Sequence, residues 1–357
     1  MKRFFSYICI LLITFSMIGC SKNEKLTNIN EFQINKAVKT INGYMAAYMK
    51  NDFQGMQKFY TEELKKKGKG QMQPSFKISS YKILDTTEMG KTANVRLNII
   101  SSDKSSPYVG VDTTIFKIKK VKGKYLIDKI SATAGKEVFQ YRNNLMVKIK
   151  DEAKSNILIN LVGVPEYCFS KSDELELDKI KVSKDGFSFL SAYNDGNTAI
   201  ISTSGANPLI GSCEIQDLEQ LEGQNQSQNQ SDQSLNDETQ PFKVAAKSIK
   251  VIDAYKNAQI MGLMASNDDE IIAVQYNTNK TMRIKMYEAQ SGDLVSKQVD
   301  SKFPDNKFNL NLIRFNEKYL IFESTPKNPK DTTSKDKSGK WIWNLKSHKV
   351  SKYAGES

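Results

Sequence analysis

Hydrophobic residues follow three different patterns along the chain. Residues 4–18 form a largely apolar run without a charged residue. Over 34–48 the apolar positions recur at steps of three and four, which predicts an amphipathic helix, and a second short helix follows over 53–64. From residue 76 onward apolar and polar positions mostly alternate, which predicts β-strands. The pattern therefore divides the chain into a leader, a helical segment and a long β-rich remainder.

The leader has the features of an export signal. Two basic residues precede its apolar run of 15 residues, which ends in Gly19-Cys20. A helix that spans a bilayer needs roughly 20 apolar residues, so this run is a signal-peptide core rather than an anchor. Its end resembles the bacterial lipobox, which implies a lipoprotein signal peptide over 1–19, a lipid on Cys20 and a lipidated tether over 20–30. The alternative is a plain secretory leader with a chance cysteine.

Residues 31–140 are predicted to form an α+β domain, with a helix packed on a curved antiparallel sheet. The strands include a hairpin with a turn at Lys122-Gly123. The segments YMAAYMKNDFQGMQKFYTEEL (44–64), GKTANVRLNI (90–99) and KKVKGKYLIDKI (119–130) resemble the nuclear-transport-factor-2-like superfamily, in particular its exported bacterial members. The resemblance implies a cone-like fold with a pocket. Enzymes of that superfamily place Asp and His in the pocket, but no histidine lies in this stretch.

A connecting helix is predicted over 141–162, because apolar residues there keep helical spacing. Residues 163–357 have short alternating segments joined by turns, and this strand–turn–strand pattern resembles the blades of a β-propeller. We therefore expect an all-β, partial β-propeller-like domain of about four blades at roughly 40–45 residues each. A large β-sandwich is the alternative. A Gln-, Asn- and Ser-rich insertion at about 222–241 is predicted to be disordered.

Few residues in the mature chain are candidates for chemistry. Cys168 and Cys213 could form a disulfide outside the membrane, or remain buried free thiols. Trp341 and Trp343 share one face of a predicted strand, which favours core packing but also allows a carbohydrate or partner contact. The single histidine, His348, is predicted to be an exposed spectator.

Catalytic, metal and cofactor sites find no support in the sequence. Asp268, Asp269 and Glu270 are adjacent, but they fall in a predicted hairpin turn, where Asp favours turn geometry. Multi-histidine metal sites are excluded with only one histidine present, and a Ser-His-Asp or Cys-His arrangement would need His348, the predicted spectator. No phosphate-binding glycine motif occurs. We therefore expect no cofactor and no metal.

The basic charge is interpreted as solvated surface. The formal net charge is +12, but only five of the 52 basic residues are arginine, and the lysines are spread along the whole chain. Nucleic-acid readers favour arginine gathered on one face, so no nucleic acid is expected as a partner. A basic exported protein is attracted to anionic headgroups and wall polymers.

These patterns predict a non-catalytic binding or sensing lipoprotein on the outer face of the cell membrane. Its partners would be the membrane, through the lipid on Cys20, and an envelope protein or wall polymer that the sequence does not identify. Two alternatives stay open, a carboxylate-dependent envelope hydrolase and a structural factor in wall or spore-envelope assembly. The richness in Lys, Asn and Ile and the lipobox favour a Gram-positive source.

Overall fold

The structure is a computed structural model that describes residues 32–67, 76–103, 105–132, 135–149, 154–216, 246, 248–330 and 332–355. The predicted leader, the lipidation site Cys20, the tether and the insertion at 222–241 lie outside these residues. No helix within the described ranges is long and apolar enough to cross a membrane.

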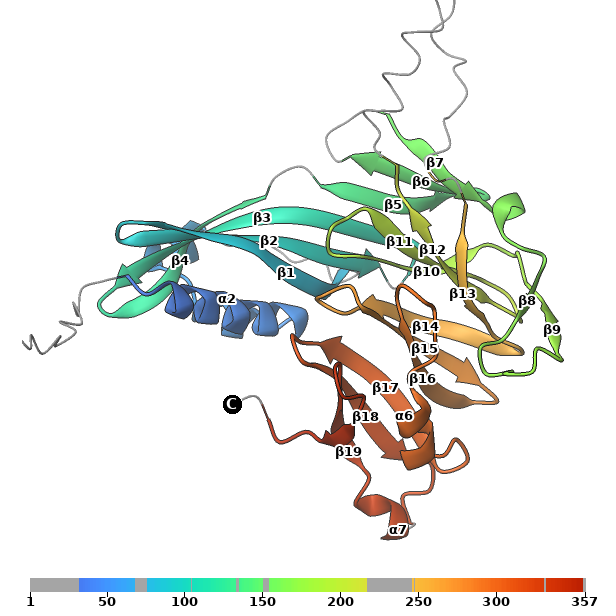
Figure 1. The fold of residues 1–357 in the computed structure, drawn as a ribbon. Coiled ribbons are helices and arrows are strands. Elements are labelled where there is room, and N and C mark those ends of the chain that lie inside the picture. Colours follow the sequence, from blue (N-terminus) through green and yellow to red (C-terminus); the bar gives the residue numbers. More distant parts are fainter. Residues whose placement is uncertain are drawn as a thin grey trace, which may run out of the picture. The chain divides into compact units, whose positions relative to one another are not determined.

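The first part of the chain places a helix against an antiparallel sheet (Figure 1). Tyr44 of the first helix packs edge-on against Phe116 of the sheet, with ring centroids 5.4 Å apart. Its hydroxyl lies 3.1 Å from that of Tyr60, so the polar end of the buried ring is satisfied. The first predicted helix is confirmed as α2 (Ile34–Met49). The second, predicted over 53–64, is instead two short helices, α3 (Phe53–Gln57) and α4 (Glu62–Lys67).

One seven-stranded antiparallel sheet follows, in the order β1-β2-β3-β5-β6-β7, with β4 also paired to β3. The predicted turn at Lys122-Gly123 joins β3 to β4, and both residues have the positive φ that a tight hairpin needs, 48° and 81°. The strands are β1 (Phe76–Met89), β2 (Thr92–Asp103), β3 (Tyr108–Val121), β4 (Lys124–Ala132), β5 (Lys136–Tyr141), β6 (Asn144–Ile149) and β7 (Asn156–Asn160).

The predicted boundary at residue 140 falls inside this sheet. The connecting helix predicted over 141–162 is wrong, because β6, β7 and a short 3-10 turn, η1 (Leu161–Gly163), occupy that segment. Leu145, Met146 and Val147 are all buried, so the run lacks the alternation of a half-exposed strand. From Ile34 to Ser357 the chain forms one compact unit.

Three further sheets of three or four strands follow in the described part of the chain, each an antiparallel meander (Figure 1). Turns at 194–197, 267–270 and 316–318 each join the first two strands of a sheet, as the predicted strand–turn–strand pattern requires. The strands are β10 (Phe187–Ala192), β11 (Thr198–Thr203), β12 (Leu209–Glu214) and β13 (Lys250–Ala254), then β14 (Ala258–Ala265), β15 (Ile271–Thr278) and β16 (Thr281–Glu288), then β17 (Phe308–Phe315), β18 (Tyr319–Pro326), β19 (Gly339–Asn344) and β20 (Val350–Lys352).

Short elements complete the fold. A two-stranded sheet, β8 (Tyr167–Phe169) with β9 (Lys179–Lys181), precedes the meanders. Two short helices, α6 (Lys297–Lys302) and α7 (Thr332–Lys335), lie between strands of the C-terminal region.

Clusters of buried apolar side chains lie between successive sheets. One joins the seven-stranded sheet to β10–β13, a second joins β10–β13 to β14–β16, and a third joins β14–β16 to β17–β20. Trp341 and Trp343 belong to the third cluster and are 6% and 0% exposed. They are therefore core residues, and the hypothesis that they contact a carbohydrate or partner is wrong. His348 is half-buried rather than exposed, because its ring stacks on that of Trp343, with ring centroids 4.8 Å apart.

A buried carboxylate joins two of the sheets at their outer strands. Asp253 of β13 is fully buried. Its Oδ1 accepts hydrogen bonds from the backbone N–H groups of Lys171 and Ala254, at 2.8 and 2.7 Å. Its Oδ2 accepts from Lys285 Nζ at 3.1 Å and from the Tyr287 hydroxyl at 2.5 Å, both on β16. The burial of this charge is tolerable because four donors surround it.

Substitution of Asp253 by Ala should be strongly destabilising. The change leaves Lys285 buried without its counter-ion, and loss of one partner of a buried ion pair costs about 3–5 kcal/mol. Urea unfolding followed by circular dichroism measures the difference. The control is Glu323→Ala, which removes an exposed carboxylate from β18 and should change the free energy of unfolding by less than about 0.5 kcal/mol. A loss below about 1 kcal/mol for Asp253→Ala would contradict a structural role for the pair.

Candidate functional site

Cys168 and Cys213, the two cysteines among the described residues, are free thiols in the structure. Cys213, on β12, is fully buried among the aliphatic side chains of the first cluster. Burial raises the pKa of its thiol to about 12, which makes it a packing residue and a poor nucleophile. Cys168 is half-buried on β8, and its thiol donates to the carbonyl of Phe169 at 3.2 Å. The disulfide considered for this pair is therefore not formed in the structure.

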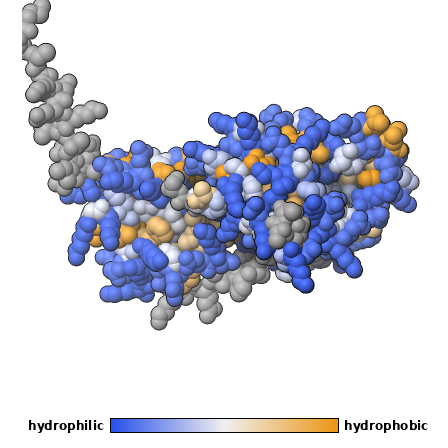
Figure 2. Space-filling model, turned by 90° about the horizontal axis from the view of Figure 1, so that it is seen from below, coloured by the Kyte–Doolittle hydropathy of each residue, from blue (hydrophilic) through white to orange (hydrophobic). Residues whose placement is uncertain are grey.

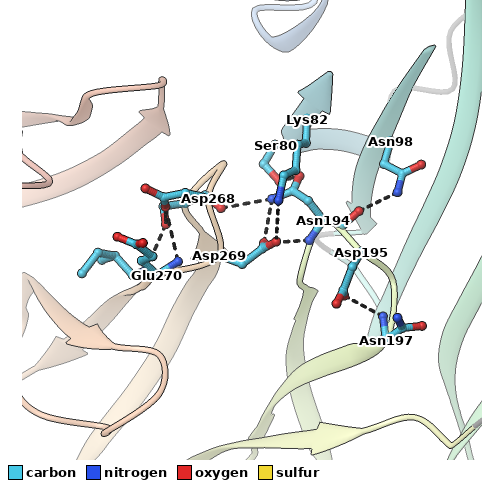
Figure 3. A network of polar contacts seen from close by, with 11 residues as sticks. Ser80, Lys82, Asn98, Asn194, Asp195, Asn197, Asp268, Asp269 and Glu270 are labelled. Atoms are coloured by element: carbon cyan, nitrogen blue, oxygen red, sulfur yellow. Dashed lines mark hydrogen bonds and ion pairs between the residues drawn. The ribbon is translucent and has the colours of Figure 1, made fainter. Parts of the chain in front are cut away.

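The three adjacent carboxylates form the turn between β14 and β15, as predicted. Figure 3 shows that Asp269 points toward the turn between β10 and β11. Its Oδ1 accepts hydrogen bonds from Asn194, from the backbone N–H at 2.7 Å and the side-chain amide at 2.8 Å. Its Oδ2 lies 3.5 Å from Lys82 Nζ on β1. The carboxylate thus connects three sheets.

Asn194 extends the same network to the seven-stranded sheet (Figure 3). Its side-chain oxygen accepts from the Ser80 hydroxyl at 3.3 Å, and its backbone carbonyl accepts from the amide of Asn98 at 2.6 Å. Asn194 is fully buried. The network therefore satisfies polar groups that burial would otherwise penalise.

The geometry leaves Asp269 no catalytic role. Burial raises the pKa of its carboxyl, and nearby Asp195 adds to the effect. A general acid must present a proton to a substrate, but both oxygens of Asp269 face donors of the protein itself. Asp268 likewise accepts from the Ser266 hydroxyl at 2.5 Å within the turn. Across the described ranges, no group of three or more His, Cys, Asp or Glu side chains is placed to hold a metal.

The exposed surface offers no broad apolar area on the face shown in Figure 2, where hydrophobic side chains appear only as small groups among hydrophilic ones. Partner proteins generally cover larger apolar patches.

A cleft of about 560 Å³ opens between the first strands of two successive sheets, β10 and β14. Pockets for small molecules commonly have volumes in the range of roughly 300–1,000 Å³. Strand beginnings, the loop between β11 and β12 and the turn before β14 form its walls. The lining residues are Ser188, Phe189, Thr203, Ser204, Gly205, Ala206, Pro208, Asn257, Ala258, Gln259, Ile260 and Asn277.

The lining carries no charge, and more of its surface is apolar than polar. Hydroxyl and amide side chains alternate with small or apolar ones, and none of the described residues that line the cleft ionises near neutral pH. The side-chain oxygen of Asn277 is buried and has no hydrogen-bond partner among the described residues. A buried acceptor without a partner is unfavourable, so a ligand group that reached this oxygen and donated to it would be stabilising.

The walls of the cleft are held in place by the chain itself. Gly205 has φ of 116°, and a Cβ atom there would lie 2.4 Å from that of Ser183, so the loop needs glycine at this point. The carbonyl of Ala206 accepts from the N–H of Ala258 at 2.9 Å, which ties the loop to β14. The cleft is therefore largely preformed.

A second cleft of about 510 Å³ is lined in part by Asn207, which belongs to the loop between β11 and β12. Its lining differs in carrying charge, with Glu166, Lys181, Lys184 and Asp185. Opposite charges stand side by side there, so the cleft has no single sign that would select an ion. The neutral cleft is the better defined candidate.

Comparisons with known proteins add little. No protein-family model matches the chain, and no curated protein does. Similar solved structures include an NTF2-like protein of unknown function from Shewanella baltica, with 16% identity over 28% of this chain and 92% of that one, and a TM-score of 0.21. The Swd1 β-propeller domain of Myceliophteria thermophila is also similar, with 9% identity and a TM-score of 0.26. The match covers 70% of this chain and 80% of the Swd1 domain.

Oligopeptidase B from Leishmania major is also among the similar structures, with 9% identity, 82% of this chain covered and a TM-score of 0.24. This chain spans only 42% of that enzyme. Because all three TM-scores are low, neither a shared fold nor a shared activity follows from the likeness.

Loss of the Asp269 carboxylate should destabilise the protein through Asn194. Asp269→Ala leaves two buried N–H donors without an acceptor, which costs about 2–3 kcal/mol. Asp269→Asn retains a carbonyl oxygen for these donors and should cost about 1 kcal/mol or less. Denaturant unfolding distinguishes the two, with Glu270→Ala as the control in the same turn. Equal losses for the Ala and Asn variants would show that the hydrogen bonds contribute nothing.

The same carboxyl should make stability depend on pH. Burial raises the pKa of Asp269 in the folded protein, so between the folded and unfolded pKa values the folded state binds the extra proton. The contribution of Asp269 to stability therefore rises as pH falls through its folded pKa, and levels off below the unfolded value. The amide of the Asp269→Asn variant does not take up a proton in this range, so the variant lacks this contribution to the pH dependence. The difference in free energy of unfolding, wild type minus Asn variant, should increase between pH 7 and pH 4, and a flat difference would contradict the shift.

Proposed function

We propose that the protein is a non-catalytic binding module of the cell envelope, exported and held on the outer face of the membrane by a lipid on Cys20. In this proposal the β-sheets form a partial β-propeller that carries the ligand cleft. The helix and curved sheet of the first part form a nuclear-transport-factor-2-like unit beside it. The neutral cleft between β10 and β14 is the binding site.

The uncharged lining of the cleft is the observation that carries the proposal. Hydrolysis by serine needs a base beside the hydroxyl, and glycoside hydrolysis needs paired carboxylates. The cleft offers Ser188, whose hydroxyl lies 2.6 Å from that of Ser202 and has no ionisable neighbour in the lining. A preformed pocket with hydrogen-bonding groups but no acid, base or activated nucleophile is suited to binding.

The leader supports the proposed location. Its basic start, short apolar run and Gly19-Cys20 ending fit a lipoprotein signal. Two acyl chains on one cysteine provide stable membrane attachment, at about 0.8 kcal/mol per buried methylene. A soluble module tethered in this way would sample the envelope close to the membrane surface.

Two substitutions test location and binding separately. Cys20→Ala removes the lipid site, so the variant should leave the membrane fraction and appear in the soluble fraction or the medium. Ala206→Trp places a large ring in the cleft at an exposed position. Binding is measured by co-sedimentation of the Cys20→Ala chain with envelopes from cells that lack the protein, and Ala206→Trp in that background should reduce it at least tenfold.

Ala206→Ser is the matched control, because it changes the same position without filling the cleft, and it should bind as well as its parent. Circular dichroism and thermal unfolding verify that the Trp variant is folded. If folded Ala206→Trp binds envelopes normally, the cleft is not the binding site. Release of soluble fragments from the envelopes by the wild-type cleft would point to a hydrolase instead.

A further inference from the structure

We infer that the neutral cleft binds an uncharged saccharide, either free or as part of a wall polymer. The inference rests on the proposed function and gives its ligand a chemical class. It follows from the hydrogen-bonding groups, the aromatic ring and the backbone groups that line the cleft.

The amide side chains of the cleft match the hydroxyl groups of a sugar. A sugar hydroxyl donates one hydrogen bond and accepts others, and an amide side chain also does both. Asn257 and Gln259 are exposed at the beginning of β14, and Asn277 lies directly across from Gln259 on β15. The orphan oxygen of Asn277 would accept a hydrogen bond from a ligand hydroxyl. No fixed charge in the described lining would select an ionic ligand in preference.

Phe189 supplies an apolar surface among these polar groups. It is half-buried, packs against the second cluster and lines the cleft. The face of an aromatic ring is weakly negative and attracts the slightly positive C–H groups on the apolar side of a pyranose. A ligand with C–H groups on one side and hydroxyls at its edge would satisfy both kinds of lining.

The backbone of the walls disfavours a peptide ligand. A peptide strand that adds to a sheet edge needs free N–H and C=O groups. The N–H and C=O of Phe189 are both already bonded to the Ser202 hydroxyl, at 2.9 and 3.0 Å. The N–H of Ala258 donates to Ala206. Recognition in this cleft therefore depends on side chains.

Chemical treatment of the envelope separates the two classes of ligand. The unlipidated Cys20→Ala chain is tested by co-sedimentation with envelopes that are untreated, oxidised with periodate or digested with proteinase K. Periodate cleaves vicinal diols, so it should abolish binding, whereas protease digestion should leave it intact. Because the site is uncharged, an increase from 50 to 500 mM NaCl should change binding less than twofold. Maltotetraose, cellotetraose and chitotetraose are added as competitors.

Asn277→Leu tests the site itself. The variant should bind about tenfold more weakly, equivalent to about 1.4 kcal/mol, while its melting temperature should not fall, because the change removes a buried acceptor that has no partner. Gln275→Leu is the contrasting variant on the same strand. Its side chain accepts from the N–H of Leu312 at 2.8 Å, so it should lower the melting temperature and leave binding unchanged.

The inference is overturned if binding survives periodate, is lost after protease digestion or depends strongly on salt. It is also overturned if folded Asn277→Leu binds like its parent. The proposed function stands in those cases as long as Ala206→Trp still blocks binding, because the cleft would then hold a ligand of another class. If Ala206→Trp has no effect, the proposed function itself fails.

Discussion

β3 is the strand on which both parts of the chain depend, because it is hydrogen-bonded to three others. One edge pairs with β2 along most of its length, whereas the other pairs first with β5, through Tyr108–Val111, and then with β4, through Thr114–Val121. Fourteen residues extend roughly 46 Å as a strand. The part of the sheet next to α2 and the part beside β10–β13 are therefore joined by one continuous backbone ladder rather than by a linker. Neither part can be separated without exposing unpaired N–H and C=O groups.

This ladder also determines where the cleft lies. The seven-stranded sheet holds the turn after β10 through Asn98, and Asp269 ties that turn to the one after β14. β10 and β14, the first strands of their sheets, are thus both fixed where they end. The cleft lies at their beginnings, around Ser188 and Ala258. The same arrangement of strands therefore fixes the turns after β10 and β14 and places the neutral cleft where the two strands begin.

The strands and turns of the C-terminal half were largely predictable, since turn residues recur at regular intervals between apolar segments. The segment after residue 140 was not. Its apolar residues at 145, 149 and 157 fit helical spacing, yet β-branched Val147, Ile149, Ile157 and Ile159 favour strands. Burial on both faces removes the alternation that would have decided between them. The pairing of β5 and β6 with β3 is a long-range contact that no local pattern reveals.

The candidate site was beyond sequence reasoning for a different reason. Its residues come from four separate stretches, and Ser, Thr, Asn and Gln are common in turns and exposed strands everywhere. No spacing marks them as a group. The one available signal was Gly205 beside Pro208, which predicts an ordered loop but not a ligand. Trp341 and Trp343 drew attention because aromatic residues often contact ligands, but two large apolar rings on one strand face were needed for the core.

Ionisable side chains are distributed unevenly between the core and the neutral cleft. Asp253, Lys285 and Arg283 are buried charged residues, and each has a partner of opposite charge: Asp253 pairs with Lys285, and Arg283 pairs with the partly exposed Asp300. Asp269 does the same at the junction of three sheets. The described lining of the neutral cleft, in contrast, contains no ionisable side chain at all. Proton transfer needs a titratable group that faces the substrate. The buried groups Asp253, Lys285 and Asp269 face partners within the protein, whereas the neutral cleft presents amides, hydroxyls and one aromatic ring, which are groups suited to hydrogen bonding and packing with a neutral ligand.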